Sequence, residues 1–216
     1  MNHSLTTPSV PSAPANGAPD PRPLLWRAVD QAERQVVVAG PTDLDRATPC
    51  AGWSVRTLLG HLVAVERRIT HIAGGGQPFE VPSLVTDVPD EGWTRAWAEA
   101  RTELEAALAD DAVLDRIFAH PAGDFPARQA IVAYVNELTV HGWDLARALG
   151  SHGVLGSADA LDDDLAEASL GPIRQFLPAE PRGGPVPFGP VVEVPADAPA
   201  YDRLLGWMGR DPHWTA

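Results

Sequence analysis

The sequence predicts an all-α fold, and three observations favour this class. Between positions 54 and 73, apolar residues recur at steps of three and four, which places them on one face of a helix. These residues are Leu58, Leu62, Val65, Ile69 and Ile72. Glycine and proline gather toward the two ends of the chain, so the middle is free to form regular structure. Only one short segment, Val191 to Val194, resembles a strand.

Capping and helix-breaking residues mark the first three helices. The first is expected from about Pro23 to Ala39, with proline in its first turn and Gly40-Pro41 after its end. Ser54 can cap a second helix that continues to Ala73, where a run of glycines follows. A third helix is expected from about Glu91 to Ala109.

The second half of the chain predicts three more helices. After a turn rich in proline and glycine, a fourth helix is expected from about Ala127 to Leu149, and Gly150 closes it. The acidic residues that begin at Asp162 open a fifth helix, which ends before Pro178. A last short helix is expected from Ala200 to Met208.

These elements divide the chain into three parts. Residues 1–22 are expected to be a disordered tail, and they lack the basic start and apolar run of a signal peptide. Residues 23–150 are expected to form the helical bundle around one core. Residues 151–216 form an extension that packs on the bundle and is rich in proline from Pro181 to Pro199.

Composition excludes several classes of partner. The 216 residues carry a formal net charge of -13, which repels nucleic acids and anionic membranes. No apolar stretch approaches the roughly 20 residues of a membrane helix. Cys50 is the single cysteine, so no intramolecular disulfide can form, as is typical of a reducing cytoplasm. We therefore expect a cytoplasmic protein without nucleic-acid or membrane partners.

The fourth predicted helix carries the candidate chemistry. Glu137 and His141 are four residues apart, so they lie on one helical face, one turn from each other. Tyr134 and Asp144 fall in the same sector at about 100° per residue. The apolar stripe of this helix lies beside that sector, so we expect these polar side chains to face the interior.

A buried carboxylate is costly unless it is paired or binds a metal. We therefore interpret Glu137 and His141 as half of a metal site, and His61 on the second helix as the best third ligand. Two histidines and one glutamate leave a coordination position open, which is the pattern of a catalytic zinc site. The alternative is a hydrogen-bonded network of the same residues without metal.

Other polar residues receive less specific interpretations. Asp144 and Tyr134 could orient His141 or hydrogen-bond a metal-bound water, or Asp144 could instead pair with Arg147 or Arg56. Cys50 precedes the second helix, and His61 lies ~10 Å along the axis from its start, so a packing role is favoured for the thiol.

The remaining histidines and two tryptophans receive structural interpretations. His71, His120, His152 and His213 lie in or near loops and helix ends, and we expect them to be solvated. Trp53 and Trp143 are expected to pack rather than to bind substrate.

Two motifs resemble those of a known family. The first is TPCAGWSVR at Thr48 to Arg56, followed by LLGHL at Leu58 to Leu62. The second is ELTVHGWDLARA at Glu137 to Ala148. They resemble the metal-binding domain of mycothiol-dependent maleylpyruvate isomerases, within the DinB/YfiT-like metalloenzymes. The ending, from Phe188 to Pro212, resembles a shorter actinobacterial branch of metal-binding proteins.

The resemblance covers about Leu24 to Pro212 and implies a DinB-like four-helix bundle with up-down-down-up connectivity. It implies a divalent metal, usually zinc, held by His61, Glu137 and His141, and mycothiol as a thiol cofactor. The isomerases carry a separate C-terminal domain after the bundle, whereas this chain has a short proline-rich extension. This difference argues against maleylpyruvate as the substrate.

Three functions follow as hypotheses. The first is a metal- and mycothiol-dependent transferase or isomerase, in which a metal-activated small thiol attacks a small electrophilic substrate. The second is a non-catalytic metal-binding or stress-related protein of the same fold. The third is a structural helical protein, which the pair of motifs disfavours. The sequence does not separate the first two.

Overall fold

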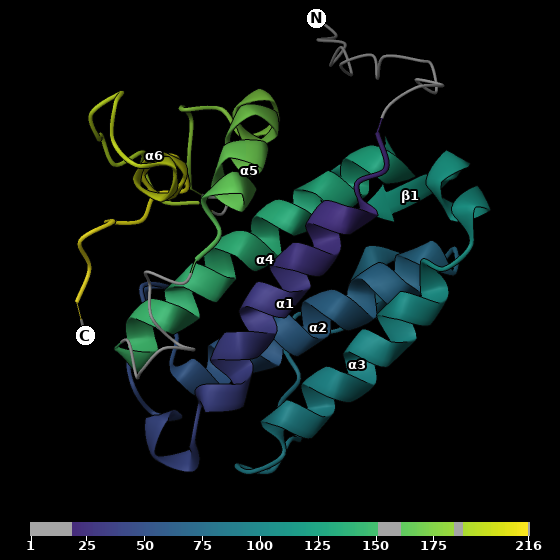
Figure 1. Cartoon of the computed structure of the whole chain (residues 1–216), viewed down its shortest axis with the longest axis horizontal. Coiled ribbons are helices and arrows are strands. Elements are labelled where there is room, and N and C mark those ends of the chain that lie inside the picture. The colour runs from purple at the N-terminus through teal and green to yellow at the C-terminus, as the bar shows by residue number, and fades with distance from the viewer. Residues whose placement is uncertain (1–18, 151–160, 184–187, 216) are drawn as a thin grey trace, which may run out of the picture.

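Helices dominate the computed structural model, which describes residues 19–150, 161–183 and 188–215 (Figure 1). The helices are α1 (Arg22–Val38), α2 (Val55–Ala73), α3 (Trp93–Ala107), α4 (Ala127–Leu149), α5 (Asp163–Phe176) and α6 (Ala200–Trp207). All six expected helices are present, and their ends lie within two residues of the expected positions. The prediction of a mainly helical protein is confirmed.

The four long helices α1 to α4 pack against one another around one core. In this group α1 contacts α4 and α3, while α2 contacts α3 and α4 (Figure 1). The predicted apolar face of α2 lies in this core, with its five members at most 1% exposed. The periodicity of apolar residues therefore identified the buried face of α2 correctly.

Helix α4 is covered on two sides. One side packs against α1 and α2, and the other packs against α5. On that second side Val140 and Trp143 join a smaller apolar cluster with residues of α5 and α6, among them Leu170 and Leu204. Polar side chains on α4 therefore lie in a largely water-excluded region between the long helices and the C-terminal segment.

Two details differ from the sequence-based expectation. The segment expected to be a turn around Gly123 is a hairpin, in which β1 (Ile117–His120) pairs antiparallel with β2 (Gly123–Pro126). Conversely, Val191 to Val194 is extended but forms no strand within the described residues. Its backbone contacts a helix instead, because the N–H of Val192 donates to the carbonyl oxygen of Gly206 at 2.9 Å.

Parts of the expected organisation lie outside the described residues. Most of the expected tail, residues 1–18, is among them, as are His152 and the rest of residues 151–160. Among the described helices, none is long and apolar enough to cross a membrane.

Candidate metal centre

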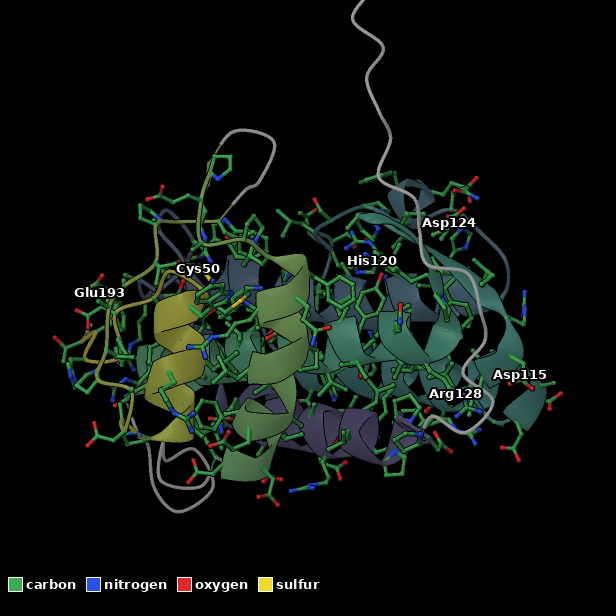
Figure 2. All side chains as sticks on the ribbon, turned by 90° about the horizontal axis from the view of Figure 1, so that it is seen from above. Cys50, Asp115, His120, Asp124, Arg128 and Glu193 are labelled. Carbon is green, nitrogen blue, oxygen red and sulfur yellow. The ribbon has the colours of Figure 1, made fainter. Side chains whose placement is uncertain are left out.

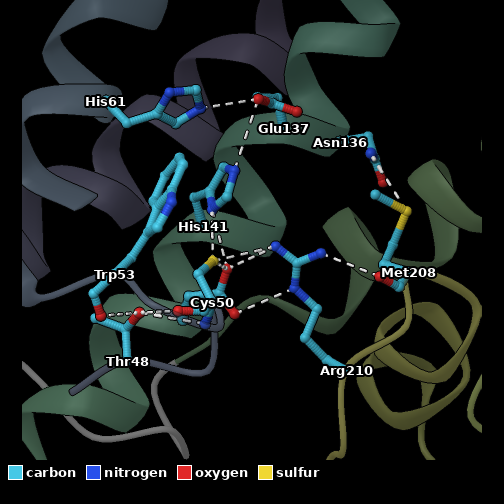
Figure 3. A network of polar contacts seen from close by, with 10 residues as sticks. Thr48, Cys50, Trp53, His61, Asn136, Glu137, His141, Met208 and Arg210 are labelled. Carbon is cyan, nitrogen blue, oxygen red and sulfur yellow. Dashed lines mark hydrogen bonds and ion pairs between the residues drawn. The ribbon is translucent and has the colours of Figure 1, made fainter. Parts of the chain in front are cut away.

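The three predicted ligands meet between α2 and α4. The Nε2 atom of His61 lies 3.0 Å from Oε1 of Glu137, and Nε2 of His141 lies 3.6 Å from the same oxygen (Figure 3). One nitrogen or oxygen atom from each residue lies within 4.8 Å of the other two. The two histidine side chains are 10% exposed, whereas the Glu137 side chain is 31% exposed, so the site opens to solvent on the glutamate side.

A close helix–loop contact orients His61. A Cβ atom at Gly60 would lie 2.3 Å from the carbonyl oxygen of Val85, so only glycine allows the loop to approach α2 this closely. The N–H of Val85 in turn donates to the carbonyl oxygen of Gly60 at 3.0 Å. This contact brings the carbonyl oxygen of Ser83 to 3.0 Å from Nδ1 of His61. Because a carbonyl only accepts, Nδ1 carries the proton and Nε2 is left to face Glu137.

On α4, Asp144 orients His141 in the same way. The Oδ2 atom of Asp144 lies 2.9 Å from Nδ1 of His141, one turn along the helix. The Asp144 side chain is fully buried. Burial opposes its ionisation, but Arg210 and His141 outweigh that effect and lower the pKa of the Asp144 carboxyl to about 2. The carboxylate therefore accepts the Nδ1 proton, and Nε2 of His141 is left to face Glu137.

Contacts within the site shift the pKa values of Glu137 and His141. Burial opposes the charge on Glu137, yet hydrogen bonds from His141 and His61 outweigh it and hold the pKa of that carboxyl well below its usual range. Burial likewise opposes the charge on His141, but Asp144, Cys50 and Glu137 raise its pKa well above the usual value. The arrangement thus concentrates negative charge around the two imidazoles and favours a cation between them.

The loop before α2 forms one wall of the site. Its turn is closed by the N–H of Trp53, which donates to the carbonyl oxygen of Cys50 at 2.9 Å. The Trp53 ring stacks on His141 with 6.0 Å between ring centroids and meets His61 edge-on at 5.1 Å. Trp53 packs as expected, but it packs against the candidate ligands and limits their movement.

Cys50 corrects the sequence-based interpretation. Its Sγ atom lies 3.0 Å from Oδ2 of Asp144 and 3.7 Å from Nδ1 of His141, so the thiol belongs to the polar network rather than to an apolar contact. The expectation failed because it measured distance along α2, whereas the loop folds back across to α4. The motif that holds Cys50 beside Trp53 was the only signal of this contact in the sequence.

Arg210 is the member of the network that sequence reasoning missed. Its guanidinium binds Asp144, for which the sequence left open an orienting role toward His141 or a pair with Arg147 or Arg56. Those arginines have other partners: Arg147 donates to the carbonyl oxygen of Pro212, and Arg56 pairs with Asp90. The Gly-Arg-Asp-Pro ending was part of the family resemblance, and a buried carboxylate in need of a cation was the physical signal that could have identified Arg210.

Among the described residues, two groups have the donor atoms for a metal, and only one of these groups fits. The first is His61, Glu137 and His141; the second is Cys50, His141 and Asp144. In the second group the guanidinium of Arg210 already lies 3.0 Å from Asp144 and 3.4 Å from Cys50, where it supplies the positive charge. The first group has two imidazole nitrogens and a carboxylate, with an exposed side, which fits a zinc-like divalent ion.

A second set of polar side chains surrounds Tyr134, one turn before Glu137 on α4. His120 belongs to the hairpin (Figure 2). It stacks edge-on against Tyr134, with 5.2 Å between ring centroids. Glu137 and Arg68 both act electrostatically on His120 and Tyr134, so the four groups share one region. His120 is half-buried rather than solvated, and burial is the main cause that lowers its pKa.

The remaining expectations have simple outcomes. The Tyr134 hydroxyl is buried and has no hydrogen-bond partner among the described residues, so it does not contact His141. His71 pairs with Glu80 at 2.7 Å, and His213 is exposed as expected. Trp143 is buried in the apolar cluster with α5 and α6, which confirms its packing role.

Comparisons with known proteins agree with the motifs. A family model described as the mycothiol maleylpyruvate isomerase N-terminal domain matches residues 25–146, which is more than half of the chain. Two proteins of Mycobacterium tuberculosis, Uncharacterized protein MT0763 and Uncharacterized protein Rv0738, are each 28% identical over 191 residues. Those alignments cover 88% of this chain and 98% of each relative.

The fold is also similar to solved structures. The crystal structure of the mycothiol-dependent maleylpyruvate isomerase matches with a TM-score of 0.55 and 13% sequence identity, covering 72% of this chain and 67% of that chain. A histidine-to-alanine mutant of the same enzyme matches with a TM-score of 0.54 and 14% identity. At this identity the likeness concerns the fold alone.

Proposed function

Because the chain belongs to the family of the mycothiol maleylpyruvate isomerase N-terminal domain, we propose that it binds a divalent metal ion and uses it to activate a small thiol. The ligands are His61, Glu137 and His141, the metal is zinc, and the thiol is mycothiol. The second substrate is a small electrophile, so the protein is a metal- and mycothiol-dependent transferase or isomerase.

The orientation of the two imidazoles carries this proposal. Each Nδ1 is committed to an acceptor, the Ser83 carbonyl for His61 and the Asp144 carboxylate for His141. Each Nε2 therefore turns its lone pair toward one carboxylate oxygen of Glu137. A cation has to lie between these nitrogens and the carboxylate, either a proton or a metal ion, and zinc accepts nitrogen and carboxylate donors of this kind.

A divalent ion held there would supply Lewis acidity, which lowers the pKa of a bound thiol and yields a thiolate near neutral pH. The chain's own groups orient the reactants and handle protons. The exposed side of Glu137 is where a small molecule can enter. One turn before Glu137 on α4, the buried Tyr134 hydroxyl has no partner among the described residues and would donate a hydrogen bond to a molecule that reaches it.

His120 and Arg68 add two further functions near Tyr134. Because burial lowers the pKa of His120, its imidazole is neutral near pH 7 and can accept a proton. Arg68 adds a positive charge that favours an anionic group on the electrophile. Together with Tyr134 they make this region the proposed binding position of the electrophile.

A spectroscopic titration tests the thiol proposal. Cobalt replaces the native metal, and mycothiol is added while absorbance is followed for a sulfur-to-metal charge-transfer band. We expect a band with mycothiol and none with S-methylated mycothiol. Glu137→Gln should weaken the response, whereas Glu80→Gln, which alters an exposed His–Glu pair away from the site, should not. If no band appears and no electrophile turns over with the thiol, the enzyme proposal is wrong.

A second candidate function is a non-catalytic metal-binding or stress-related protein with the same ligands. One observation favours it: His61, Glu137 and His141 line neither of two surface hollows of the described residues. One is lined by residues that include Trp26 and Arg101, and the other by Val85 and Arg95. Metal binding without thiol-dependent turnover would select this candidate.

The architecture we propose follows the same family membership. Helices α1 to α4 constitute a DinB-like four-helix bundle with up-down-down-up connectivity. Residues 23–150 are the metal-binding unit, residues 1–22 a tail without a role in the site, and residues 151–216 an extension. We place the protein in the cytoplasm, with no nucleic-acid or membrane partner.

A further inference from the structure

We propose that Arg210 is a positioning residue of the metal centre, which acts on His141 through the carboxylate of Asp144. The C-terminal extension would therefore complete the site and not merely cover α4. This inference rests on the proposed metal site, because it assigns a function to a residue that does not touch the metal.

The end of α6 determines where Arg210 lies. The N–H of Arg210 donates to the carbonyl oxygen of Leu205, and the N–H of Gly209 donates to that of Gly206. This pair of hydrogen bonds is the Schellman motif, which needs a left-handed residue at the position of Gly209. Gly209 has φ of 75°, which glycine adopts without strain. The chain therefore turns sharply after α6 and directs Arg210 back toward α4.

The guanidinium of Arg210 holds both oxygens of Asp144. Nη2 lies 3.0 Å from Oδ2, and Nε lies 3.3 Å from Oδ1 (Figure 3). Nη1 donates to the carbonyl oxygen of Met208 at 3.0 Å, which anchors the fork to its own helix end. The Arg210 side chain is 13% exposed and the Asp144 side chain is fully buried. Because this two-point ion pair is shielded from solvent, it fixes the orientation of the Asp144 carboxylate plane and stabilises its negative charge.

Fixing that plane has a consequence for His141. Oδ2 of Asp144 accepts from Nδ1 of His141 at 2.9 Å, so the carboxylate holds both the tautomer and the rotation of the imidazole. Without Arg210, the Asp144 carboxylate would lose the two hydrogen bonds that fix its plane and could turn away from Nδ1 of His141. His141 would then lose its preference for presenting Nε2 toward Glu137, and metal affinity would fall.

The alternative is that Arg210 only stabilises the fold by neutralising a buried charge. The two possibilities differ in what happens to metal binding in folded protein. Partners that orient a metal-ligating histidine typically change metal affinity 10- to 100-fold, roughly, when they are removed. A residue that acts only on folding leaves the affinity of the folded protein unchanged.

The experiment measures Zn²⁺ affinity by chelator competition and the absorption spectrum of the Co²⁺ form, using the full chain. Arg210→Met should bind Zn²⁺ about 10-fold to 100-fold more weakly than wild type and show an altered Co²⁺ spectrum. Arg210→Lys, which keeps the charge but not the fork, should recover part of the affinity. Arg147→Met is the matched control, since Arg147 anchors the same C-terminal segment at Pro212 without contacting Asp144. It should bind Zn²⁺ as wild type does.

A double-mutant cycle separates positioning from folding. If Arg210 acts through Asp144, then Asp144→Asn and Asp144→Asn/Arg210→Met should bind Zn²⁺ equally weakly. This comparison holds even if Arg210→Met alone does not fold, because the double variant leaves neither charge buried and unpaired. Wild-type affinity and spectrum in folded Arg210→Met, or a further loss in the double variant, would overturn the inference. A wild-type chain that binds no metal would instead overturn the proposed function.

Discussion

Two carboxyl groups are completely buried in the described part of the chain, Asp144 on α4 and Glu66 on α2, and their surroundings are opposite. Asp144 binds Arg210 and His141, which lower its pKa to about 2 in spite of burial. Neither oxygen of Glu66 has a hydrogen-bond partner among the described residues, and burial raises its pKa to about 9. One group is a fixed anion at neutral pH, and the other is a neutral acid.

The comparison shows that partners, and not burial, decide which acid is charged. The partner of Asp144 comes from a segment 66 residues away in sequence, which turns back onto α4 after α6. The charge of Arg101 acts to lower the pKa of Glu66. The Arg101 guanidinium, however, contacts Asp30, Glu33 and Glu105 instead of Glu66. The C-terminal segment thus supplies its charge to the metal centre, while Glu66 stays protonated within the packed helices.

Neutralising Asp144 should have the largest effect on stability. Asp144→Asn leaves Arg210 buried without its partner, and breaking such a pair costs about 4 kcal/mol of unfolding free energy. Urea denaturation of the metal-free protein at pH 7 measures this loss. A variant as stable as wild type would show that the ion pair contributes nothing net to the fold.

Neutralising Glu66 should increase the stability of the protein, in contrast to the loss expected for Asp144. Between its usual pKa of 4.5 and about 9, the folded protein keeps a proton on Glu66 that the unfolded chain releases, so stability falls as pH rises. Glu66→Gln removes this penalty and should raise the unfolding free energy by about 3 kcal/mol at pH 7. The gain should vanish near pH 4 and grow toward pH 9. A Glu66→Gln variant less stable than wild type at pH 7 would contradict the assignment of a neutral buried acid.

Two buried tyrosines repeat the comparison on a smaller scale. The Tyr201 hydroxyl accepts a hydrogen bond from Nε2 of Gln31 at 2.8 Å, whereas the Tyr134 hydroxyl has no partner among the described residues. Tyr201→Phe should therefore lower the unfolding free energy by about 1 kcal/mol, and Tyr134→Phe should raise it by up to about 1 kcal/mol. Thermal unfolding measures both. Equal losses in the two variants would mean that Tyr134 has a partner in solution.

The smallest effect is expected from the N-terminal residues. Deleting residues 1–18 keeps the ion pair of Asp20 with Arg22 and all residues of the metal centre. The shortened chain should unfold at the same temperature and hold the same amount of metal as the full chain. A loss of metal on deletion would place part of the site in this segment.

Local patterns predicted the helices well and the site in part. Several helix ends have a cap or a breaker within one turn, as with Ser54 before α2 and Gly150 after α4. Glu137 and His141 could be placed together for the same reason, because helix geometry alone fixes a spacing of four residues. His61 required the further assumption that α2 and α4 share a core, which their contacts support.

The contacts of Cys50 and Arg210 were missed, because they depend on how loops return to α4. Cys50 reaches Asp144 through a tight turn, and Arg210 reaches it through the motif that ends α6. The hairpin Ile117–Pro126 was also missed, since its strands of four residues are too short to show a clear alternation. Tertiary contacts, and not local propensity, determine the position of Cys50, of Arg210 and of the hairpin.

The metal content of purified protein tests the central claim most directly. Wild type, His61→Ala and His141→Ala should be compared by elemental analysis, with circular dichroism to establish that each variant keeps its helices. We expect about one divalent ion, zinc, per wild-type chain and a sharp loss in each variant with little change in helix content. Full occupancy in both variants would contradict the assignment of these histidines as ligands, and with it the account of the site.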